Sequence, residues 1–388
     1  MTARVGPAAR AKVDALGIDL ETVREAAAAH YTHPFLLLDT DVVRASVHRF
    51  RRALPGVRPH YAVKANPHPS LLKVLREEGI AFEIASVGEL DLLLELGVPA
   101  GDILYSNPVK SREHIAHAAR QGVEWFVVDC VEELRKFAAV APAAQLCLRI
   151  DVPNADSDWP LAGKFGASPA AACEVAATAA EMGADLCGVS FHVGSQCTNP
   201  ESWRLAIERA KDTLAVLQRH GLRPRLLDIG GGFPVRYTRP IPDISEIGAS
   251  VSRALANVSP EVAVIAEPGR VLVAEAACFV CRVIGTATRG GRRWMYWDAG
   301  LHGGIIETAR GGIAYEIRSD REGTLVPWIV AGPTCDAADV LAGEYLLPED
   351  LREGDFVYLP NTGAYTCARA STFNGFPLPE VRILGARD

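Results

Sequence analysis

Lys64 is the residue whose type and position most strongly suggest chemistry. It lies in the segment 59–66, where a short apolar run predicts a strand and a small polar turn follows. Its amine should therefore sit at the carboxyl end of a strand, where parallel α/β barrels carry their active sites. The other six of the seven lysines fall in helical or loop surroundings that predict a solvated charge. Lys64 is thus a candidate Schiff-base nucleophile, with a snorkelling surface lysine as the alternative.

Two further segments place polar groups directly after apolar runs. In the segment 228–234, three consecutive glycines end with Gly231 and Gly232, and such a triplet lets backbone N–H groups close around a phosphate. A tight loop explains the same pattern. In the segment 265–270, Glu267 and Arg270 could form a structural ion pair. Alternatively, the guanidinium binds a phosphate and the carboxylate faces a protonated pyridine nitrogen, which would favour carbanion chemistry.

Three more segments carry candidate groups. His192 and Ser195 follow the run 186–191, where the imidazole could stack on a flat cofactor and the hydroxyl could donate to a phosphate. Cys335 and Asp336 follow a Gly-Pro turn, so the thiol could act as a proton donor. Tyr365 lies in another glycine-containing turn and could contact a phosphate or substrate. For each segment, ordinary core packing remains the alternative.

The pattern of elements predicts how these groups are positioned. From about residue 35 to residue 270, short β-type runs, beginning with 35–38, alternate with helical stretches, which predicts parallel strands and a (β/α)8 barrel. After about residue 272, Gly and Pro turns replace the helices and predict an antiparallel β domain. We therefore expect an α/β plus all-β fold, with a barrel over 33–272 and a C-terminal β domain over 273–388. The helical segment in 1–32 could pack against either part.

Composition limits the function classes. Apolar residues make up 49% and charged residues 22%, and the net charge of −7 comes without a basic stripe, which predicts small-molecule rather than nucleic-acid partners. No apolar run reaches the length of a membrane span and no signal-peptide pattern opens the chain, so we expect a soluble, cytoplasmic protein. Nine cysteines without dense even spacing predict reduced thiols. Cys278 and Cys281 predict buried strand residues rather than a metal site, and no metal is expected.

These segments, in order and spacing, resemble the alanine-racemase-fold family of pyridoxal-phosphate amino acid decarboxylases, and the eukaryotic-type ornithine decarboxylases most closely. The resemblance extends from about Tyr61 to Phe376. The segments that carry it are Tyr61-Ala62-Val63-Lys64-Ala65-Asn66, Tyr105–Lys110, Lys164–Ala167, Gly188–Ser195, Leu227–Pro234, Glu267–Arg270, Gly332–Asp336 and Gly363–Phe376.

The resemblance implies a role for each candidate. Lys64 would hold pyridoxal 5'-phosphate as a Schiff base, Glu267 would pair with the ring nitrogen, His192 would stack on the ring, and Glu83 would lie near it. The phosphate would be held by Ser195, Gly231, Gly232, Arg270 and Tyr365. It also implies a homodimer with active sites shared across the interface, in which Cys335 protonates the substrate carbon after CO2 leaves and Asp336 binds the distal amine.

One segment departs from the ornithine pattern. Ornithine decarboxylases carry an acid directly before the glycine of the segment Tyr296–Gly300, and here that position is Ala299. Asp298 stands one residue earlier, which in a strand points to the opposite face. The order Asp-Ala-Gly looks instead like diaminopimelate decarboxylases. His302, with Arg310 further on, could accept an acidic or amide-bearing group as readily as Asp336 accepts an amine, so Asp336, Asp298 and His302 are all candidate substrate ligands.

We therefore expect a carboxy-lyase that acts on L-ornithine, lysine or a related basic amino acid in polyamine biosynthesis. A decarboxylase of a modified, acidic or conjugated amino acid in a specialised pathway is the alternative. A racemase would need a second base and a weaker partner for the ring nitrogen, so Glu267 and Cys335 argue against it. A non-catalytic regulator of the same fold should have lost some of the site residues, and Lys64, His192, Glu267, Arg270 and Cys335 are all present.

Overall fold

The computed structural model describes residues 17–160 and 163–384, which form two compact units. One unit consists of Val47–Pro234 and Ile241–Gly269, and we call it the barrel unit. The other consists of the described residues up to Ser46, Val235–Pro240, and the described residues from Arg270 onward, and we call it the β unit. In the described part of the chain, no helix combines the length and the apolar character that a membrane span needs.

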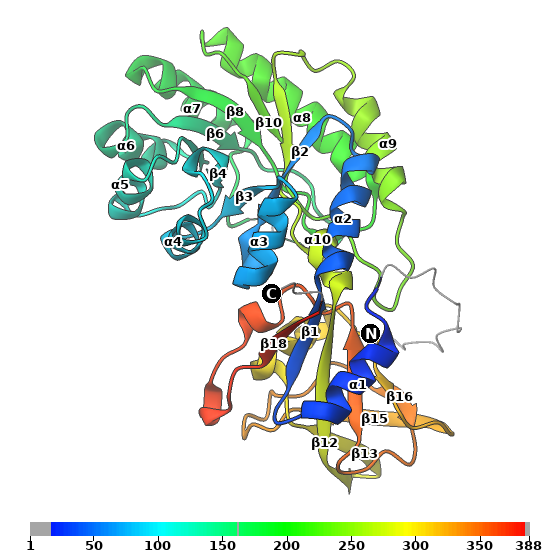
Figure 1. Cartoon of the computed structure of the whole chain (residues 1–388). Helices are drawn as coiled ribbons and strands as arrows, with labels where there is room; N and C mark the ends of the chain where they lie inside the picture. The colour runs from blue at the N-terminus through cyan, green and yellow to red at the C-terminus, as the bar shows by residue number, and fades with distance from the viewer. Residues whose placement is uncertain (1–16, 161–162, 385–388) are drawn as a thin grey trace. The chain divides into compact units, whose positions relative to one another are not determined.

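The barrel unit contains a closed barrel of parallel strands with helices on its outside (Figure 1). The strands, in spatial order, are β10 Leu226–Asp228, β11 Ala263–Ala266, β2 Val57–Ala62, β3 Ala81–Ile84, β4 Ile103–Tyr105, β5 Trp125–Val128, β6 Gln145–Arg149 and β8 Leu186–Ser190. The helices are α3 Pro69–Glu77, α4 Val87–Glu95, α5 Arg112–Arg120, α6 Val131–Val140, α7 Pro169–Met182, α8 Pro200–Arg219 and α9 Ile244–Leu255, while α2 Thr40–Ala53 crosses the unit boundary. The expected TIM-type barrel is confirmed.

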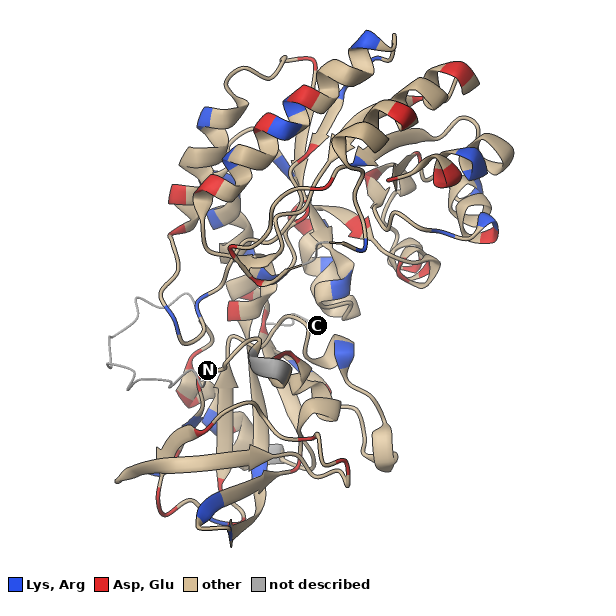
Figure 2. Cartoon of the chain, turned by 180° about the vertical axis from the view of Figure 1, so that it is seen from behind, with Lys and Arg blue, Asp and Glu red and all other residues tan. Residues whose placement is uncertain are grey.

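Local sequence explains where the barrel helices begin. Ser86, Ser111 and Ser168 each cap the first turn of the helix that follows by accepting a backbone N–H, and Asp243 forms a capping box with Glu246. The buried strands end two or more residues before these caps, so each connection presents its polar residues at the carboxyl end of the barrel. Basic and acidic residues are interspersed along the outer helices (Figure 2), as in the i,i+3 pairs Arg204–Glu201 and Lys211–Glu208 of α8.

The first predicted barrel strand belongs to the other unit, so the expected barrel start at residue 33 differs from the structure. Strand β1, Phe35–Asp39, pairs antiparallel with β12, Ala277–Arg289, and parallel with β18, Glu380–Leu384. A run of buried apolar residues suits either a barrel strand or a sheet covered on both faces, so periodicity could not distinguish the two. The eight later runs between residues 57 and 266 supply the whole barrel.

The β unit is built on a mostly antiparallel sheet in the order β14-β17-β12-β13-β15-β16, with β1 and β18 attached through β12. Its further strands are β13 Arg292–Trp297, β14 Arg318–Ser319, β15 Leu325–Ala331, β16 Tyr345–Pro348 and β17 Phe356–Pro360. The pairs β13–β15 and β1–β18 are parallel, unlike the rest. A separate two-stranded antiparallel sheet, β7 Ser157–Trp159 with β9 Ser195–Cys197, lies in the barrel unit.

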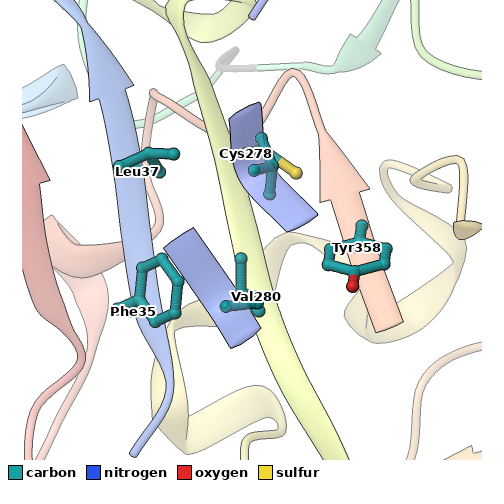
Figure 3. Close-up of a cluster of buried hydrophobic side chains, with 7 residues drawn as sticks. Phe35, Leu37, Cys278, Val280 and Tyr358 are labelled. Atoms are coloured by element: carbon teal, nitrogen blue, oxygen red, sulfur yellow. The ribbon is translucent and has the colours of Figure 1, made fainter. Parts of the chain in front are cut away.

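A buried cluster joins the N-terminal helix to this sheet. Phe35 and Leu37 of β1 face Val280 and Cys278 of β12 beside Tyr358 (Figure 3), and Val23 and Ala27 of α1, Leu20–His30, complete the cluster. The helical segment therefore packs in the β unit, and residues 8–16 of the expected helix lie outside the described part. Cys278 and Cys281 are both buried, and burial raises the pKa of the Cys278 thiol to about 12.

Two half-buried histidines in the barrel unit should make its stability depend on pH. Burial lowers the pKa of His60 to about 4 and that of His192 to about 3, whereas unfolded histidine titrates near 6.5. Below pH 6.5 the unfolded chain therefore binds more protons, and stability falls as the pH falls. We expect about 2 kcal/mol of lost stability per histidine at pH 5, measured by urea denaturation. His60→Gln should show a shallower pH dependence than the wild type, and equal slopes would refute this assignment.

Candidate active site

Lys64 lies two residues beyond the end of β2, in a single 3-10 turn, Val63–Ala65. Strand register places its partner, because Ala62 pairs with Glu83 of β3. The Lys64 amine donates to one oxygen of Glu83, and the Ser106 hydroxyl donates to the other. The Glu83 side chain is 1% exposed, whereas that of Lys64 is 42% exposed. The Lys64 amine is thus held by a buried carboxylate while much of its side chain stays accessible, so a bound carbonyl group could reach it.

A second lysine, Lys110, corrects the expectation that every other lysine is solvated. It is 3% exposed and lies in the loop after β4. Its amine donates to the carbonyls of Asn107 at 2.6 Å, Pro108 at 3.1 Å and Val127 at 2.6 Å. Burial lowers its pKa to about 7. All three hydrogen bonds go to backbone carbonyls, and the one to Val127 connects the loop to strand β5. The local sequence around Lys110 does not reveal this contact.

Glu267 follows β11 and sits beside the Lys64 turn. Its N–H donates to Gly230 at 2.8 Å, and the next carbonyl, that of Pro268, accepts from the Ala62 N–H at 3.2 Å. Its Oε1 atom is buried and has no hydrogen-bond partner. Burial and then the charge of Glu83 raise its pKa. A buried oxygen without a hydrogen bond is costly, so Oε1 could accept one from a group bound beside it, while Asp228 and Ser106 also interact with the Glu267 carboxyl.

Asp228, which ends β10, is a second buried acid in this region. It is 1% exposed, and its Oδ1 accepts the Gly230 N–H at 2.9 Å. Burial and then the neighbouring Glu267 raise its pKa well above the usual range. Asp228 thus positions the first glycine of the triplet through a hydrogen bond.

The glycine triplet leaves no room for side chains. A Cβ atom on Gly230 would lie 2.1 Å from the Phe191 carbonyl oxygen, one on Gly231 would lie 2.6 Å from that of Glu267, and one on Gly232 would lie 2.2 Å from that of Gly194. Gly230 and Gly232 also have φ of +66° and +92°, a region that favours glycine. The backbone is therefore packed at van der Waals contact, as a phosphate-binding loop requires.

His192 lies directly beneath this loop. Its Nδ1 accepts the Gly194 N–H at 3.0 Å, which leaves the proton of the neutral ring on Nε2. Burial, then the charges of Arg149 and Lys64, lower its pKa to about 3, so the imidazole is neutral at physiological pH. Ser195 begins β9 a few residues later and is half-buried. A neutral, fixed ring of this kind can stack on a flat cofactor.

The barrel residues fit a pyridoxal group. Lys64 offers the amine, Glu267 has an orphaned buried oxygen for a ring N–H, and His192 offers a flat neutral face. The Gly230–Gly232 loop could hold a phosphate by its backbone N–H groups. The structure therefore brings Lys64, Glu83, His192 and Glu267 to the same end of the barrel, and we call these four residues the cofactor cluster.

A second cluster of polar residues lies in the β unit and is centred on Arg270. Its Nη1 and Nη2 donate to the two oxygens of Glu307 at 2.7 and 2.8 Å, and Nη1 also donates to the Tyr237 hydroxyl at 2.9 Å. Arg270 and Glu307 are 5% and 6% exposed. The Tyr365 ring lies 4.8 Å from the guanidinium, at a backbone φ of +57°. Because Glu307 takes the Nη1–Nη2 edge, a phosphate would have to meet the Nε–Nη2 edge.

Glu307 is therefore expected to determine whether Arg270 is correctly oriented. Glu307→Gln breaks a buried ion pair and leaves the guanidinium uncompensated, which should cost about 3 kcal/mol of stability. Thermal unfolding of the cofactor-free protein measures this change, and fluorescence titration should show weaker retention of pyridoxal phosphate. Glu316→Gln, which breaks the half-exposed pair with Arg318, is the matched control and should change stability by less than about 1 kcal/mol. Equal losses in the two variants would contradict the role of Glu307.

Cys335, Asp336 and His302 all lie in the β unit, where Asp336 contacts His302. Asp336 Oδ2 lies 2.9 Å from His302 Nε2, and Oδ1 accepts the Ala338 N–H at 2.9 Å. These two hydrogen bonds, with that from Ala338 the larger, lower the pKa of Asp336. The His302 ring stacks on Phe373 with centroids 4.5 Å apart. Asp336 is thus an oriented anion, although His302 already occupies one of its oxygens.

Asp298 has a different environment. Its carboxylate accepts from the Tyr31 hydroxyl and from the Arg282 N–H, and the shorter of the two contacts is that with Tyr31. These contacts connect the residue after β13 to the residue after α1 and to β12 within the β unit. Nothing in its contacts supports substrate binding, and the prediction stays untested. Ala299 is 2% exposed, and the Arg310 side chain lies outside the described part.

Sequence reasoning missed four acidic or hydroxyl residues that organise these clusters. Ser106 donates a hydrogen bond to Glu83, and Asp228 accepts one from the glycine loop. Glu307 accepts from Arg270, and Asp339 accepts from Thr334 in the loop that carries Cys335. Ser106 and Asp228 end or follow strands, and that position could have identified them. Glu307 and Asp339 are recognised only from contacts 37 and 38 residues away in the chain.

Fold and site together define a class: a (β/α)8-barrel enzyme whose barrel residues fit a pyridoxal cofactor. Residues 40–274 match the family described as "Pyridoxal-dependent decarboxylase, pyridoxal binding domain". The chain belongs to this family.

Individual relatives agree with that assignment. A lysine/ornithine decarboxylase of Selenomonas ruminantium is 35% identical over 346 residues, which cover 89% of this chain and 88% of the relative. Antizyme inhibitor 2 of Xenopus laevis is 35% identical over 92% of this chain and 82% of its own length. The crystal structure of a Vibrio vulnificus lysine/ornithine decarboxylase complexed with cadaverine superposes with a TM-score of 0.88 at 37% identity, covering 94% of this chain and 98% of that one.

Proposed function

We propose that this protein is a pyridoxal-phosphate-dependent α-decarboxylase of L-ornithine, with L-lysine as the next candidate. The observation that carries the proposal is the cofactor cluster, in which a lysine, a neutral stacking imidazole and a buried acid with an orphaned oxygen share one end of the barrel. The similarity to lysine/ornithine decarboxylases supports the choice of a basic amino acid.

Each residue of the clusters has a distinct task in this proposal. Pyridoxal phosphate, when bound, supplies the electron sink that stabilises negative charge at the substrate carbon after CO2 leaves. Lys64 attaches the cofactor, and Glu83 accepts a proton from its amine. Glu267 keeps a proton at the ring nitrogen, and His192 covers one face of the ring. The phosphate is held by Ser195, Gly231, Gly232, Arg270 and Tyr365.

The group at the distal end of the substrate side chain would determine which amino acid the enzyme accepts. Asp336 is an oriented anion that can accept a distal ammonium group. Since Ala299 offers no second carboxylate, one acid would carry the recognition alone, and a longer side chain such as that of lysine can satisfy it as well as ornithine does. His302 beside Asp336 supplies a further donor that could meet an amide or acid.

The test is CO2 release from ornithine, lysine, arginine, diaminopimelate and carboxynorspermidine by the pyridoxal-phosphate-loaded enzyme. We expect ornithine or lysine to exceed the rest by about 10² in kcat/KM, because distal ammonium groups at the wrong distance leave Asp336 unpaired. Asp336→Asn should raise KM for that substrate. If only an acidic or conjugated amino acid reacts, the distal-amine role of Asp336 is wrong.

We further propose that the enzyme is a homodimer in which Cys335 and Asp336 act on the partner's cofactor. Mixing the inactive variants Lys64→Ala and Cys335→Ala after dissociation tests this arrangement. Random reassociation should restore about a quarter of wild-type activity, because half the dimers are mixed and each has one complete site. No recovery upon mixing would exclude shared sites. The diamine product suits cytoplasmic polyamine biosynthesis, which fractionation of cells and diamine analysis of a deletion strain would check.

A regulator that binds protein partners is the second candidate, because a similar relative is an antizyme inhibitor. All five residues whose loss would mark a non-enzyme are retained, namely Lys64, His192, Glu267, Arg270 and Cys335. Purified protein that binds no pyridoxal phosphate and releases no CO2 from any amino acid would favour the regulator. A racemase is disfavoured by Glu267, since an acid at the ring nitrogen strengthens the electron sink beyond what racemisation uses.

A further inference from the structure

The loop that carries Cys335 is fixed by Asp339, which is 2% exposed. Asp339 Oδ2 accepts from the Thr334 hydroxyl at 2.7 Å, and Oδ1 accepts the Leu301 N–H at 2.6 Å. A Cβ atom on Gly332 would lie 2.3 Å from Asp339 Oδ2, so the loop closes tightly around the carboxylate. Asp339 therefore fixes the backbone that carries Cys335.

Asn374 contacts Cys335 twice with one atom. Its Oδ1 lies 3.2 Å from the Cys335 backbone nitrogen and 3.3 Å from Sγ. A backbone N–H can only donate, so the Asn374 atom that faces it must be the carbonyl oxygen rather than the amide nitrogen. The same oxygen faces the sulfur, and an oxygen without a proton can only accept. Sγ must then be the donor, which requires a protonated thiol.

We propose that Asn374 is a positioning residue that keeps Cys335 as a protonated thiol with its S–H bond held in a fixed direction. A thiolate in the same place would meet the negative end of the amide dipole. The proposal extends the proposed function, because a general acid must carry its proton before the reaction reaches it. After the proton moves from Sγ to the substrate carbon, the exposed thiolate regains a proton from water.

The backbone at Asn374 allows a clean test. Its φ of +55° lies in the left-handed region, which glycine, asparagine and aspartate adopt more readily than other residues. Asn374→Gly removes the acceptor and keeps the backbone, whereas Asn374→Asp keeps the shape and adds a negative charge. Neither substitution places a strained residue at this position, so the two variants separate the effect of the side chain from that of the fold.

The experiment measures iodoacetamide alkylation of Cys335 in the holoenzyme from pH 6 to 10, by peptide mass spectrometry. Cys173, the other exposed thiol among the described residues, is the internal reference. At pH 7.5 we expect Asn374→Gly to react about two- to fivefold faster than wild type and Asn374→Asp to react more slowly, with Cys173 unchanged. Equal rates in all three proteins, or faster reaction in Asn374→Asp, would overturn the proposal.

A second measurement needs neither reagent access nor turnover. The infrared S–H stretching band of Cys335, isolated by subtracting the spectrum of Cys335→Ser, should move to higher frequency in Asn374→Gly as the hydrogen bond is lost. An unmoved band would overturn the proposal even if alkylation were blocked. Neither readout uses a substrate, so a protein that shows both shifts yet releases no CO2 from any amino acid would refute the proposed function and leave the role of Asn374 standing.

Discussion

Lys64→Ala is expected to abolish activity and the visible absorbance of bound pyridoxal phosphate. The amine attaches the cofactor, and alanine offers no nucleophile, so we expect turnover to fall by about 10⁴ or more, since no other group replaces a covalent anchor. Stability should also fall, because Lys64→Ala leaves the buried Glu83 carboxylate without its ion-pair partner. The measurements are an absorbance spectrum of the purified protein and CO2 release with the best substrate.

Two other lysines provide controls. Lys73→Ala removes an exposed lysine of α3 and should leave spectrum and activity at wild-type levels. Lys110→Ala removes three buried hydrogen bonds and should lower stability while leaving the cofactor attached. Borohydride reduction followed by peptide mapping should place the label on Lys64. A label on Lys110, whose lowered pKa also makes it a plausible nucleophile, would contradict the assignment.

Glu267→Gln is expected to lower kcat by about 10² to 10³, the range seen when one preorganised charge is removed from an active site. The amide matches the carboxyl in size, so the barrel should stay folded. The amide of the glutamine has no negative charge to hold a proton at the ring nitrogen. In the wild type, burial and then Glu83 raise the pKa of Glu267, so its carboxyl can share a proton with that nitrogen. The measurement is single-turnover decarboxylation at saturating cofactor.

Asp228→Asn is the matched control for Glu267→Gln. Burial and then Glu267 raise the pKa of Asp228 well above its usual range, which favours the uncharged carboxyl that an amide imitates. We expect kcat to stay within about threefold of wild type, since no charge is removed. If Asp228→Asn lost as much activity as Glu267→Gln, the ring-nitrogen role would belong to the pair of acids and not to Glu267.

The sequence by itself determined the groups that follow a strand within a few residues. Lys64, His192, the glycine triplet and Glu267 were predicted correctly as strand-end residues, because alternating β and α patterns fix where each strand stops and parallel strands present those ends together.

Only the tertiary structure decided which groups pair across the chain. Strand β1 pairs with β12 some 240 residues later and not with the barrel. Lys110 is buried in part by its hydrogen bond to the Val127 carbonyl, which lies in the next strand. Arg270 meets Glu307, and Cys335 meets Asn374, through loops whose closure depends on packing. Local propensity and periodicity carry no information on such partners. The reaction could therefore be predicted from the sequence, whereas the residues that hold its groups in place required the fold.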